Sequence, residues 1–325
     1  ETTLVNVLPG LPLKLRVDSF GLGFALVASG LWILTSIYSI GYMRGLKEHA
    51  QTRYFFSFAL CLSATMGIAF AANLLTFFVF YEMLTIATYP LVIHKESHEA
   101  IVAGRKYLAY LLTAGVFFLF SIVWTYSLVG AIDFVPGGFL AGHASKGALQ
   151  VLFVTFLLGV GAKAAIMPIH AWLPTAMIAP TPVSALLHAV AVVKAGVFGS
   201  LRVICYVFGP RLLMDLDLWI ILAYLVSFTI LVASMFALAQ DNLKRRLAYS
   251  TISQLSYIIL GAALISQNSL TGGILHMANH AFMKITLFFT AGAIYVKTHV
   301  ENISQMDGIG RQMPFTMAAF TVGAL

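Results

Sequence analysis

Residues 163–196 read KAAIMPIHAWLPTAMIAPTPVSALLHAVAVVKAG, and this stretch indicates the fold class most directly. Lys163 ends one long apolar run, and a second apolar run follows that contains His188 and Lys194. Four prolines, at positions 168, 174, 180 and 182, separate the two runs. Because proline removes a backbone donor and clashes with the preceding turn, a helix that reaches Lys163 should break at Pro168. The stretch therefore predicts a helix, an irregular segment and a second helix, with two lysines inside apolar sequence.

The composition of the whole chain indicates the surroundings of this stretch. Of the 325 residues, 60% are hydrophobic and only 10% are charged. A soluble domain has about 45–50% apolar and about 25% charged residues, so one soluble core could not bury this surplus. The composition excludes a disordered chain and a conventional cytosolic enzyme, and two cysteines exclude a secreted disulfide scaffold. A polytopic membrane protein is the class that fits.

Nine apolar runs are long enough to cross a bilayer, which takes about 20 helical residues. They cover residues 18–43, 54–72, 74–93, 107–130, 148–167, 183–207, 217–240, 247–265 and 271–296, and a tenth run begins at 314. The runs are continuous, whereas a β-barrel would alternate apolar and polar residues. We expect an all-α fold with nine full transmembrane helices, a truncated tenth and one discontinuous helix. The missing initial methionine and the short last run predict an internal piece of a longer protein, truncated at both ends.

Lysine and arginine are distributed unevenly over alternate connectors, which predicts the orientation of the chain. One side collects eleven cations: Arg44, Lys47, Arg53, Lys95, Arg105, Lys106, Lys244, Arg245, Arg246, Lys297 and Arg311. The other side collects five: Lys14, Arg16, Lys146, Arg202 and Arg211. The first set should face the cytoplasm. The net charge of +7 therefore reflects membrane topology and not a nucleic-acid partner.

Seven ionisable residues lie inside the apolar runs, where each charge costs several kcal/mol and therefore indicates a role. They are Glu82, Lys163, His188, Lys194, His276, His280 and Lys284. Lys163 precedes the predicted break, and discontinuous helices are where transporters place their ion sites. His188 and Lys194 are six residues apart, so they should face different neighbours. The last three residues are spaced by four and line one stripe of a helix.

Three of these residues also have a structural interpretation. Glu82 could be a neutral acid with one hydrogen bond, Lys163 could extend to the membrane interface, and His188 could be an ordinary core histidine. A metal site at His276 and His280 lacks a nearby carboxylate or cysteine to complete the ligand set. Histidine exchanges protons near neutral pH, and a buried lysine holds its proton more firmly when a carboxylate is close. Together the residues favour a proton pathway, and we expect no metal, no cofactor and no redox centre.

Four segments resemble one protein family. They are residues 163–196, Ser39-Ile-Gly-Tyr-Met43, residues 243–257 (LKRRLAYSTISQLSY) and the stretch from His276 to Lys284. The chain resembles the antiporter-like proton-translocating subunits of respiratory complex I, membrane-bound hydrogenases and Mrp sodium/proton antiporters, and is most similar to an Mrp D-type subunit. This resemblance implies inverted five-helix repeats. Residues 1–53 would then be a leading segment with one helix, 54–207 the first repeat, and 217–325 the second, truncated repeat.

The resemblance also implies roles for individual residues. Glu82 matches the glutamate of the family's fifth helix, and Lys163 matches the lysine that pairs with it in the broken seventh helix. Lys194, with His188 beside it, matches the lysine that connects the two half-channels. His280 and Lys284 match the central relay of the eleventh helix, and His276 belongs to the same stripe. No acid in the run 247–265 mirrors Glu82.

The implied function is proton movement in a multisubunit complex of a prokaryotic cell membrane, coupled to Na⁺/H⁺ antiport. The partners would be other membrane subunits, the lipid bilayer, H⁺ and, in an antiporter, Na⁺. One alternative is the proton-pumping arm of an NADH:quinone oxidoreductase or a membrane-bound hydrogenase, a translocase without its own redox centre. Two alternatives of other classes are a membrane anchor for a soluble partner in inorganic-carbon uptake and a purely structural scaffold.

Overall fold

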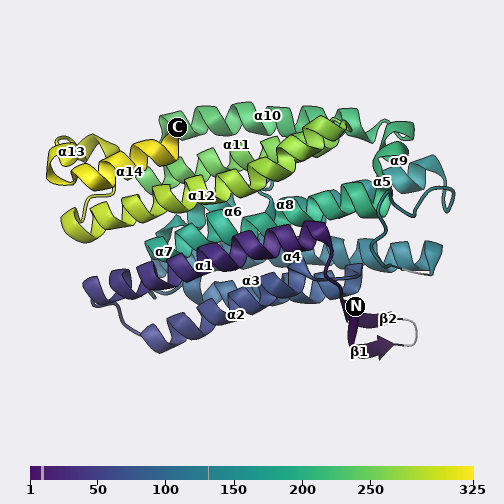
Figure 1. Ribbon diagram of the computed structural model, residues 1–325, viewed down its shortest axis with the longest axis horizontal. Coiled ribbons are helices and arrows are strands. Elements are labelled where there is room, and N and C mark those ends of the chain that lie inside the picture. Colours follow the sequence, from purple (N-terminus) through teal and green to yellow (C-terminus); the bar gives the residue numbers. More distant parts are fainter. Residues whose placement is uncertain (9–10, 131) are drawn as a thin grey trace.

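The computed structural model describes residues 1–8, 11–130 and 132–325, and its long helices run side by side along one axis (Figure 1). The continuous long helices are α1 (Ser19–Gly45), α2 (Gln51–Ala69), α3 (Leu74–Val92), α4 (His98–Val129), α5 (Lys146–Lys163), α10 (Leu218–Ala239), α11 (Leu243–Ala263) and α12 (Gln267–Thr298). Shorter elements are α9 (Pro210–Asp215), η4 (Ile303–Gln305), α13 (Ile309–Gln312) and α14 (Pro314–Ala324). The predicted all-α membrane fold is confirmed.

Six of the described helices are long and apolar enough to cross a membrane. They are α1, α3, α4, α5, α10 and the composite helix Thr181–Phe208. The helices α2, α11 and α12 coincide with predicted runs but carry more polar sequence, and α14 has only 11 residues. The chain is therefore a multi-pass membrane protein with about six long apolar helices, and the count of nine full spans stays a prediction.

One element differs from the all-α expectation. Strands β1 (Thr2–Leu8) and β2 (Leu11–Leu15) form an antiparallel hairpin that projects beyond one end of the bundle (Figure 1). It is tied to the start of α3, because Thr76 Oγ1 accepts from the Lys14 amide at 2.8 Å and Asn73 donates to the Pro12 carbonyl at 2.8 Å. Thr2, Thr3 and Val5 are β-branched residues, which fit a strand.

The composite helix Thr181–Phe208 lies at the centre of the bundle. It consists of α7 (Thr181–Ala185), the π-helical η2 (Leu186–Val190), α8 (Val192–Arg202) and the π-helical η3 (Val203–Phe208). Of its most apolar 18 residues 89% are buried, against 33–50% in the other five long apolar helices. In η2 the Ala191 amide bonds to the carbonyl of Leu186, five residues back, at 3.0 Å. Single π turns are rare and frequently occur at functional sites.

The predicted helix break is confirmed, but it begins earlier than Pro168. Helix α5 ends at Lys163, and Ala165 has a φ of 56°, which no continuing α-helix allows. Only α6 (Trp172–Thr175) and η1 (Ala176–Ile178) interrupt the irregular chain before Thr181. The Trp172 indole donates to the Ala162 carbonyl at 2.8 Å, which satisfies one acceptor that the end of α5 leaves free. Residues 163–167 are buried, as irregular backbone at membrane depth must be.

The two sets of connector cations lie at opposite ends of the bundle, with two corrections. Arg105 and Lys106 were assigned to a connector that ends at 106, but they lie about two turns inside α4. Connectors 46–50, 93–97 and 240–242 meet at the end that carries α13, and the hairpin and α9 mark the other end (Figure 1). Arg202 was assigned to a connector, and this assignment is wrong. Its side chain is 1% exposed inside the bundle and pairs with Asp18, with Nη1 2.6 Å from Oδ2. The second set therefore has four connector cations.

Candidate functional site

Lys163 lies against α3 and not against the Glu82 carboxylate. Its ammonium bonds to the Tyr81 carbonyl and sits 3.3 Å from the centre of the Tyr81 ring. The Lys163 side chain is fully buried. Among the described residues, neither carboxyl oxygen of Glu82 has a hydrogen-bond partner, although both oxygens are buried. Lys163 of α5 is thus bonded to Tyr81, the residue next to Glu82 in α3, and not to Glu82 itself.

The Glu82 carboxyl group points instead toward α4, where Gly115 makes room for it. A Cβ atom at Gly115 would lie 2.7 Å from Glu82 Oε1 and 3.2 Å from Oε2. Atoms at that separation would clash, so the absence of a side chain at this position permits the observed orientation. The sequence predicted the depth of Glu82 but not this contact.

Lys194 and His280 are the two predicted residues that the structure joins directly. Lys194 Nζ lies 2.9 Å from His280 Nδ1 and donates to the Met277 carbonyl at 2.9 Å. Both side chains are almost fully buried, Lys194 at 1% and His280 at 0% exposure. Hydrogen bonds between α8 and α12 therefore run through the centre of the bundle.

The predicted stripe on α12 faces two different helices. His276 Nε2 lies 2.7 Å from Gln254 Oε1, and Lys284 Nζ lies 2.7 Å from Ser250 Oγ, so both ends of the stripe contact α11. His280, between them, faces α8. No acid occurs on the predicted run 247–265, and a serine hydroxyl contacts Lys284 instead.

His188 also lies against α12, where its ring is tilted by 30° to that of Phe288 with 4.9 Å between ring centroids. His188 and Lys194 thus have different residue neighbours, Phe288 and His280, as expected, but both neighbours lie on α12. The spacing rule of a regular α-helix does not apply between them, because η2 is π-helical and Ala191 after it has non-helical angles (φ −105°, ψ −85°). Both ring nitrogens of His188 lack a hydrogen-bond partner within the described part of the chain.

Helix α8 packs directly on the end of α5. A Cβ atom at Gly196 would lie 2.8 Å from the Lys163 Cβ and would meet the backbone of Ala164 more closely still. The seven ionisable residues thus lie on elements that touch one another, namely α3, α5, η2, α8 and α12, and α12 in turn contacts α11. The partners that sequence reasoning missed are Tyr81, Ser250 and Gln254. Tyr81 is next to Glu82, and the other two lie in the family segment 243–257. The sequence therefore pointed to their segments but not to their contacts.

A cavity of about 560 Å³ opens beside the irregular segment. It is bounded by the start of α4 at His98, by Thr175 and Met177 of the segment, and by Lys244 at the start of α11. Water and ions can therefore approach the broken helix from the end of the bundle that carries most of the cations. In the described residues, neither His276 nor His280 joins a cluster of three metal-ligating side chains.

A family model agrees with this arrangement. The model described as "NADH:quinone oxidoreductase/Mrp antiporter, TM" matches residues 71–325. The chain belongs to this family. A second model, "NADH-Ubiquinone oxidoreductase (complex I), chain 5 N-terminus", matches residues 10–55 of this chain. The resemblance seen in the motifs is confirmed at the level of the complex I/Mrp superfamily.

Curated relatives of this antiporter-family chain carry different names. NADH-quinone oxidoreductase subunit N of Desulforudis audaxviator is 30% identical over 96% of the chain and 62% of the relative. Hydrogenase-4 component B of Escherichia coli is 31% identical over 96% and 48%, respectively. A relative from Rhizobium meliloti, named as part of a probable K(+)/H(+) antiporter, is 32% identical over 94% and 30%. The chain thus spans between 30% and 62% of the length of these relatives.

A solved structure has the same antiporter-family fold. The membrane-bound sulfane sulfur reductase, an archaeal respiratory membrane complex, contains a chain that superimposes with a TM-score of 0.86 at 26% identity. The match covers 99% of this chain and 65% of the other.

Proposed function

We propose that this chain is a proton-translocating, antiporter-like subunit of a multisubunit membrane complex. The observation that supports this best is the 2.9 Å contact between Lys194 and His280, which links α8 to α12 between two buried groups that can carry protons. An ammonium and an imidazole at hydrogen-bond distance can exchange a proton directly. Ionisable residues inside membrane helices mark ion pathways and proton relays by default.

Glu82 and Lys163 would act as the gate of this pathway. The separated arrangement is one state of the gate, because the buried carboxyl of Glu82 has no bonded partner among the described residues. In the second state the carboxylate would turn from Gly115 toward Lys163 and stabilise its charged form. Alternation between the two states would make Lys163 bind a proton and then release it toward Lys194.

Neutral substitution tests this gate in the full complex. Glu82→Gln and Lys163→Ala should each lower proton flux into inside-out vesicles by roughly 100-fold or more, the smallest effect expected for loss of a proton-transfer group. Complex assembly, followed by gel filtration, should persist. The exposed pair Asp215→Asn and Lys146→Ala provides matched controls with normal flux. Normal flux in both gate variants would contradict the mechanism.

The ion that exchanges for H⁺ is Na⁺ in our proposal, with the chain in the role of an Mrp D-type subunit in a prokaryotic cell membrane. Support comes from the family description, which includes Mrp antiporters, and from the antiporter named among the relatives. Flux that requires Na⁺ but no electron donor would support this role.

A redox-driven complex is the second candidate, favoured by the sulfane sulfur reductase fold and by the hydrogenase-4 relative. The chain would then be a translocase subunit that contains no redox centre of its own. Iron–sulfur subunits that co-purify with the chain, together with flux that requires an electron donor, would favour this candidate.

The finer topology belongs to the same proposal. We expect nine full spans and a further one from residue 314, with the cation-rich end in the cytoplasm. The units 54–207 and 217–325 would be inverted repeats after a leading segment, 1–53. In support, α3 with Glu82 and the broken helix fall in the first unit, and the stripe of α12 falls in the second.

A further inference from the structure

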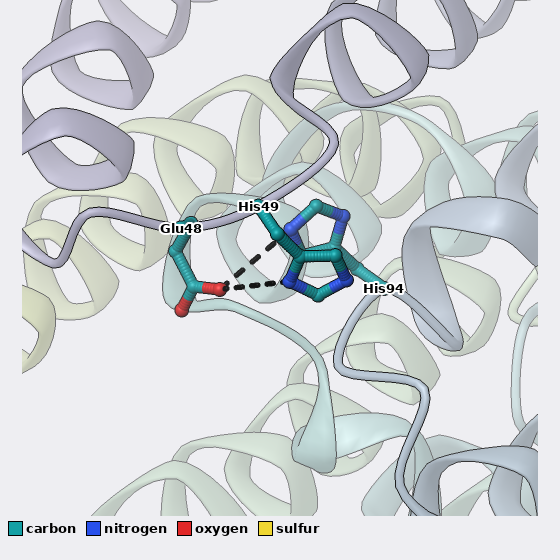
Figure 2. A group of neighbouring side chains, drawn as sticks. All are labelled: Glu48, His49 and His94. Carbon is teal, nitrogen blue, oxygen red and sulfur yellow. Dashed lines mark ion pairs between the residues drawn. The ribbon is translucent and has the colours of Figure 1, made fainter.

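A second group of ionisable side chains lies outside the proposed pathway, at the cation-rich end of the bundle. Glu48 and His49 belong to the connector between α1 and α2, and His94 follows α3 by two residues (Figure 2). One ligand-type atom from each side chain lies within 4.8 Å of the others. The group therefore joins two connectors that are 45 residues apart in the sequence.

His94 is the unusual member of this group. Its side chain is 0% exposed, and within the described residues neither ring nitrogen has a hydrogen-bond partner. A buried imidazole without a hydrogen-bond partner is costly to the fold, and a free ring nitrogen is the atom with which histidine binds metal ions.

The distances around Glu48 fit a small cation. Glu48 Oε2 lies 3.7 Å from His94 Nε2 and 4.0 Å from His49 Nδ1. Ligands about 2.1 Å from a tetrahedral zinc ion are roughly 3.4 Å from each other, so a small inward shift would complete the site. The His49 and His94 rings are stacked with 4.9 Å between centroids, and His49 must turn to face the ion. Its side chain is 49% exposed and has room to do so.

A further carboxylate lies behind His49. Glu96 Oε1 is 3.8 Å from His49 Nε2, the nitrogen that faces away from Glu48, and Glu96 is itself paired with Arg53. Metal-bound histidines usually donate their other N–H to such a carboxylate, which fixes the ring in its ligating orientation.

We propose that Glu48, His49 and His94 form a binding site for a zinc-class divalent cation. Two imidazoles and one carboxylate are a ligand set that Zn²⁺ favours, and a water on the exposed side would be the fourth ligand. The bound ion would use one of the two unpartnered nitrogens of His94 and would clamp the connector 46–50 to the end of α3. This site departs from the expectation that the chain binds no metal, and it is independent of the proposed function.

The zinc content of the purified protein tests the proposed site directly. The full-length protein, purified in its complex and stripped with EDTA, is incubated with ZnCl₂ and desalted, and zinc is counted by elemental mass spectrometry. We expect Glu48→Gln and His94→Gln complexes to retain about one Zn²⁺ fewer per chain than the wild type. The matched control is His98→Gln, which changes an exposed histidine in the same connector region. Co²⁺ should give the intense visible absorption of a four-coordinate site in the wild type only.

If the His94→Gln variant fails to fold, Glu48→Gln and His49→Ala still test the site. Both Glu48 and His49 are more exposed than His94, so their substitution disturbs the fold less. Equal zinc content in the wild type, Glu48→Gln and His49→Ala would overturn the proposal. Absence of retained zinc in the wild type would overturn it as well, and would assign the group to a direct hydrogen bond from His94 to Glu48.

Discussion

At the scale of single residues, a carboxyl group inside a helix bundle needs space as well as a partner, and Gly115 provides the space for Glu82. A methyl group at Gly115 would lie 2.7 Å from Glu82 Oε1 and would displace it. If Glu82 alternates between α4 and Lys163, this small residue sets how far the carboxyl can withdraw. The effect requires no change of charge anywhere in the pathway.

Gly115→Ala should therefore lower proton flux by roughly 10- to 100-fold, as expected when a reacting group is misplaced by about 1 Å. Flux is measured in the assembled complex. Gly30→Ala is the matched control, because nothing lies within 4 Å of a Cβ at Gly30 of α1, and its flux should be normal. Wild-type flux in the Gly115 variant would show that Glu82 does not use the position beside α4.

The depth of the ionisable residues could be predicted from the sequence, but their partners could not. Lys163 stands out because lysine is rare inside an apolar run. Its contact with the Tyr81 carbonyl depends on how α5 and α3 pack, and no spacing rule gives this. Ser250, the partner of Lys284, is one of several serines and threonines in its segment. The group of Glu48, His49 and His94 was missed because its members lie in two connectors that only the fold brings together.

At the scale of elements, the ion pair of Asp18 and Arg202 ties the start of α1 to α8. Arg202 lies 4.5 Å from the ring centroid of Tyr206 and 4.9 Å from that of Phe198. Among the described residues, its only charge partner is Asp18. Arg202 was counted with the connector cations although it lies within the predicted run 183–207, close to its end. The structure buries it instead, since Asp18 and the aromatic rings stabilise the charge where it is.

Asp18→Asn should lower the free energy of unfolding by about 3 kcal/mol, because it leaves a buried guanidinium without its carboxylate. The cap of α1 is retained, since asparagine can also accept from the Gly21 amide, which now bonds to Asp18 at 2.7 Å. Unfolding is followed by circular dichroism in detergent.

The comparison for this variant is Asp133→Asn. Asp133 pairs with Lys14 at 3.1 Å, but the Asp133 side chain is 46% exposed, so its loss should cost less than about 1 kcal/mol. Equal effects of the two substitutions would contradict a special role for the buried pair.

At the scale of the whole molecule, the bounds of the long helices could be predicted to within about four residues from the apolar runs, except for the start of α4. That helix begins at His98 and not at 107, because its first turns carry charged residues such as Glu99, Arg105 and Lys106. The strands Thr2–Leu8 and Leu11–Leu15 were missed, because the residues before the first apolar run were assigned only to a leading segment and given no structure of their own. The predicted orientation across the bilayer rests on the distribution of lysine and arginine alone. Eleven lie at one end and four at the other once Arg202 is removed from the count.

Labelling with a membrane-impermeant maleimide tests this orientation. In a background without Cys61 and Cys205, His143→Cys should be labelled in intact cells and Lys47→Cys only in inside-out vesicles. Three helices, α2 to α4, separate the two positions, which places them at opposite ends. Labelling of Lys47→Cys from outside the cell would reverse the proposed orientation, and labelling of both from one side would contradict the three intervening spans.

The π-helical segment η2 has a consequence for how insertions and deletions act on this protein. In a regular α-helix six residues turn the chain by about 600°, which would leave His188 and Lys194 about 120° apart around the axis. The π turn Leu186–Val190 and the irregular Ala191 after it (φ −105°, ψ −85°) depart from that geometry, and both residues contact α12. A π turn holds one residue more than an α-helical turn, so a return to regular α-helix would absorb the deletion of one residue within Leu186–Val190 and leave the helix beyond it in place. The same deletion between Val192 and Lys194, in regular helix, would instead turn Lys194 by about 100° away from His280 without changing any ionisable group. Leu186–Val190 is therefore the part of this buried helix that tolerates a change in length.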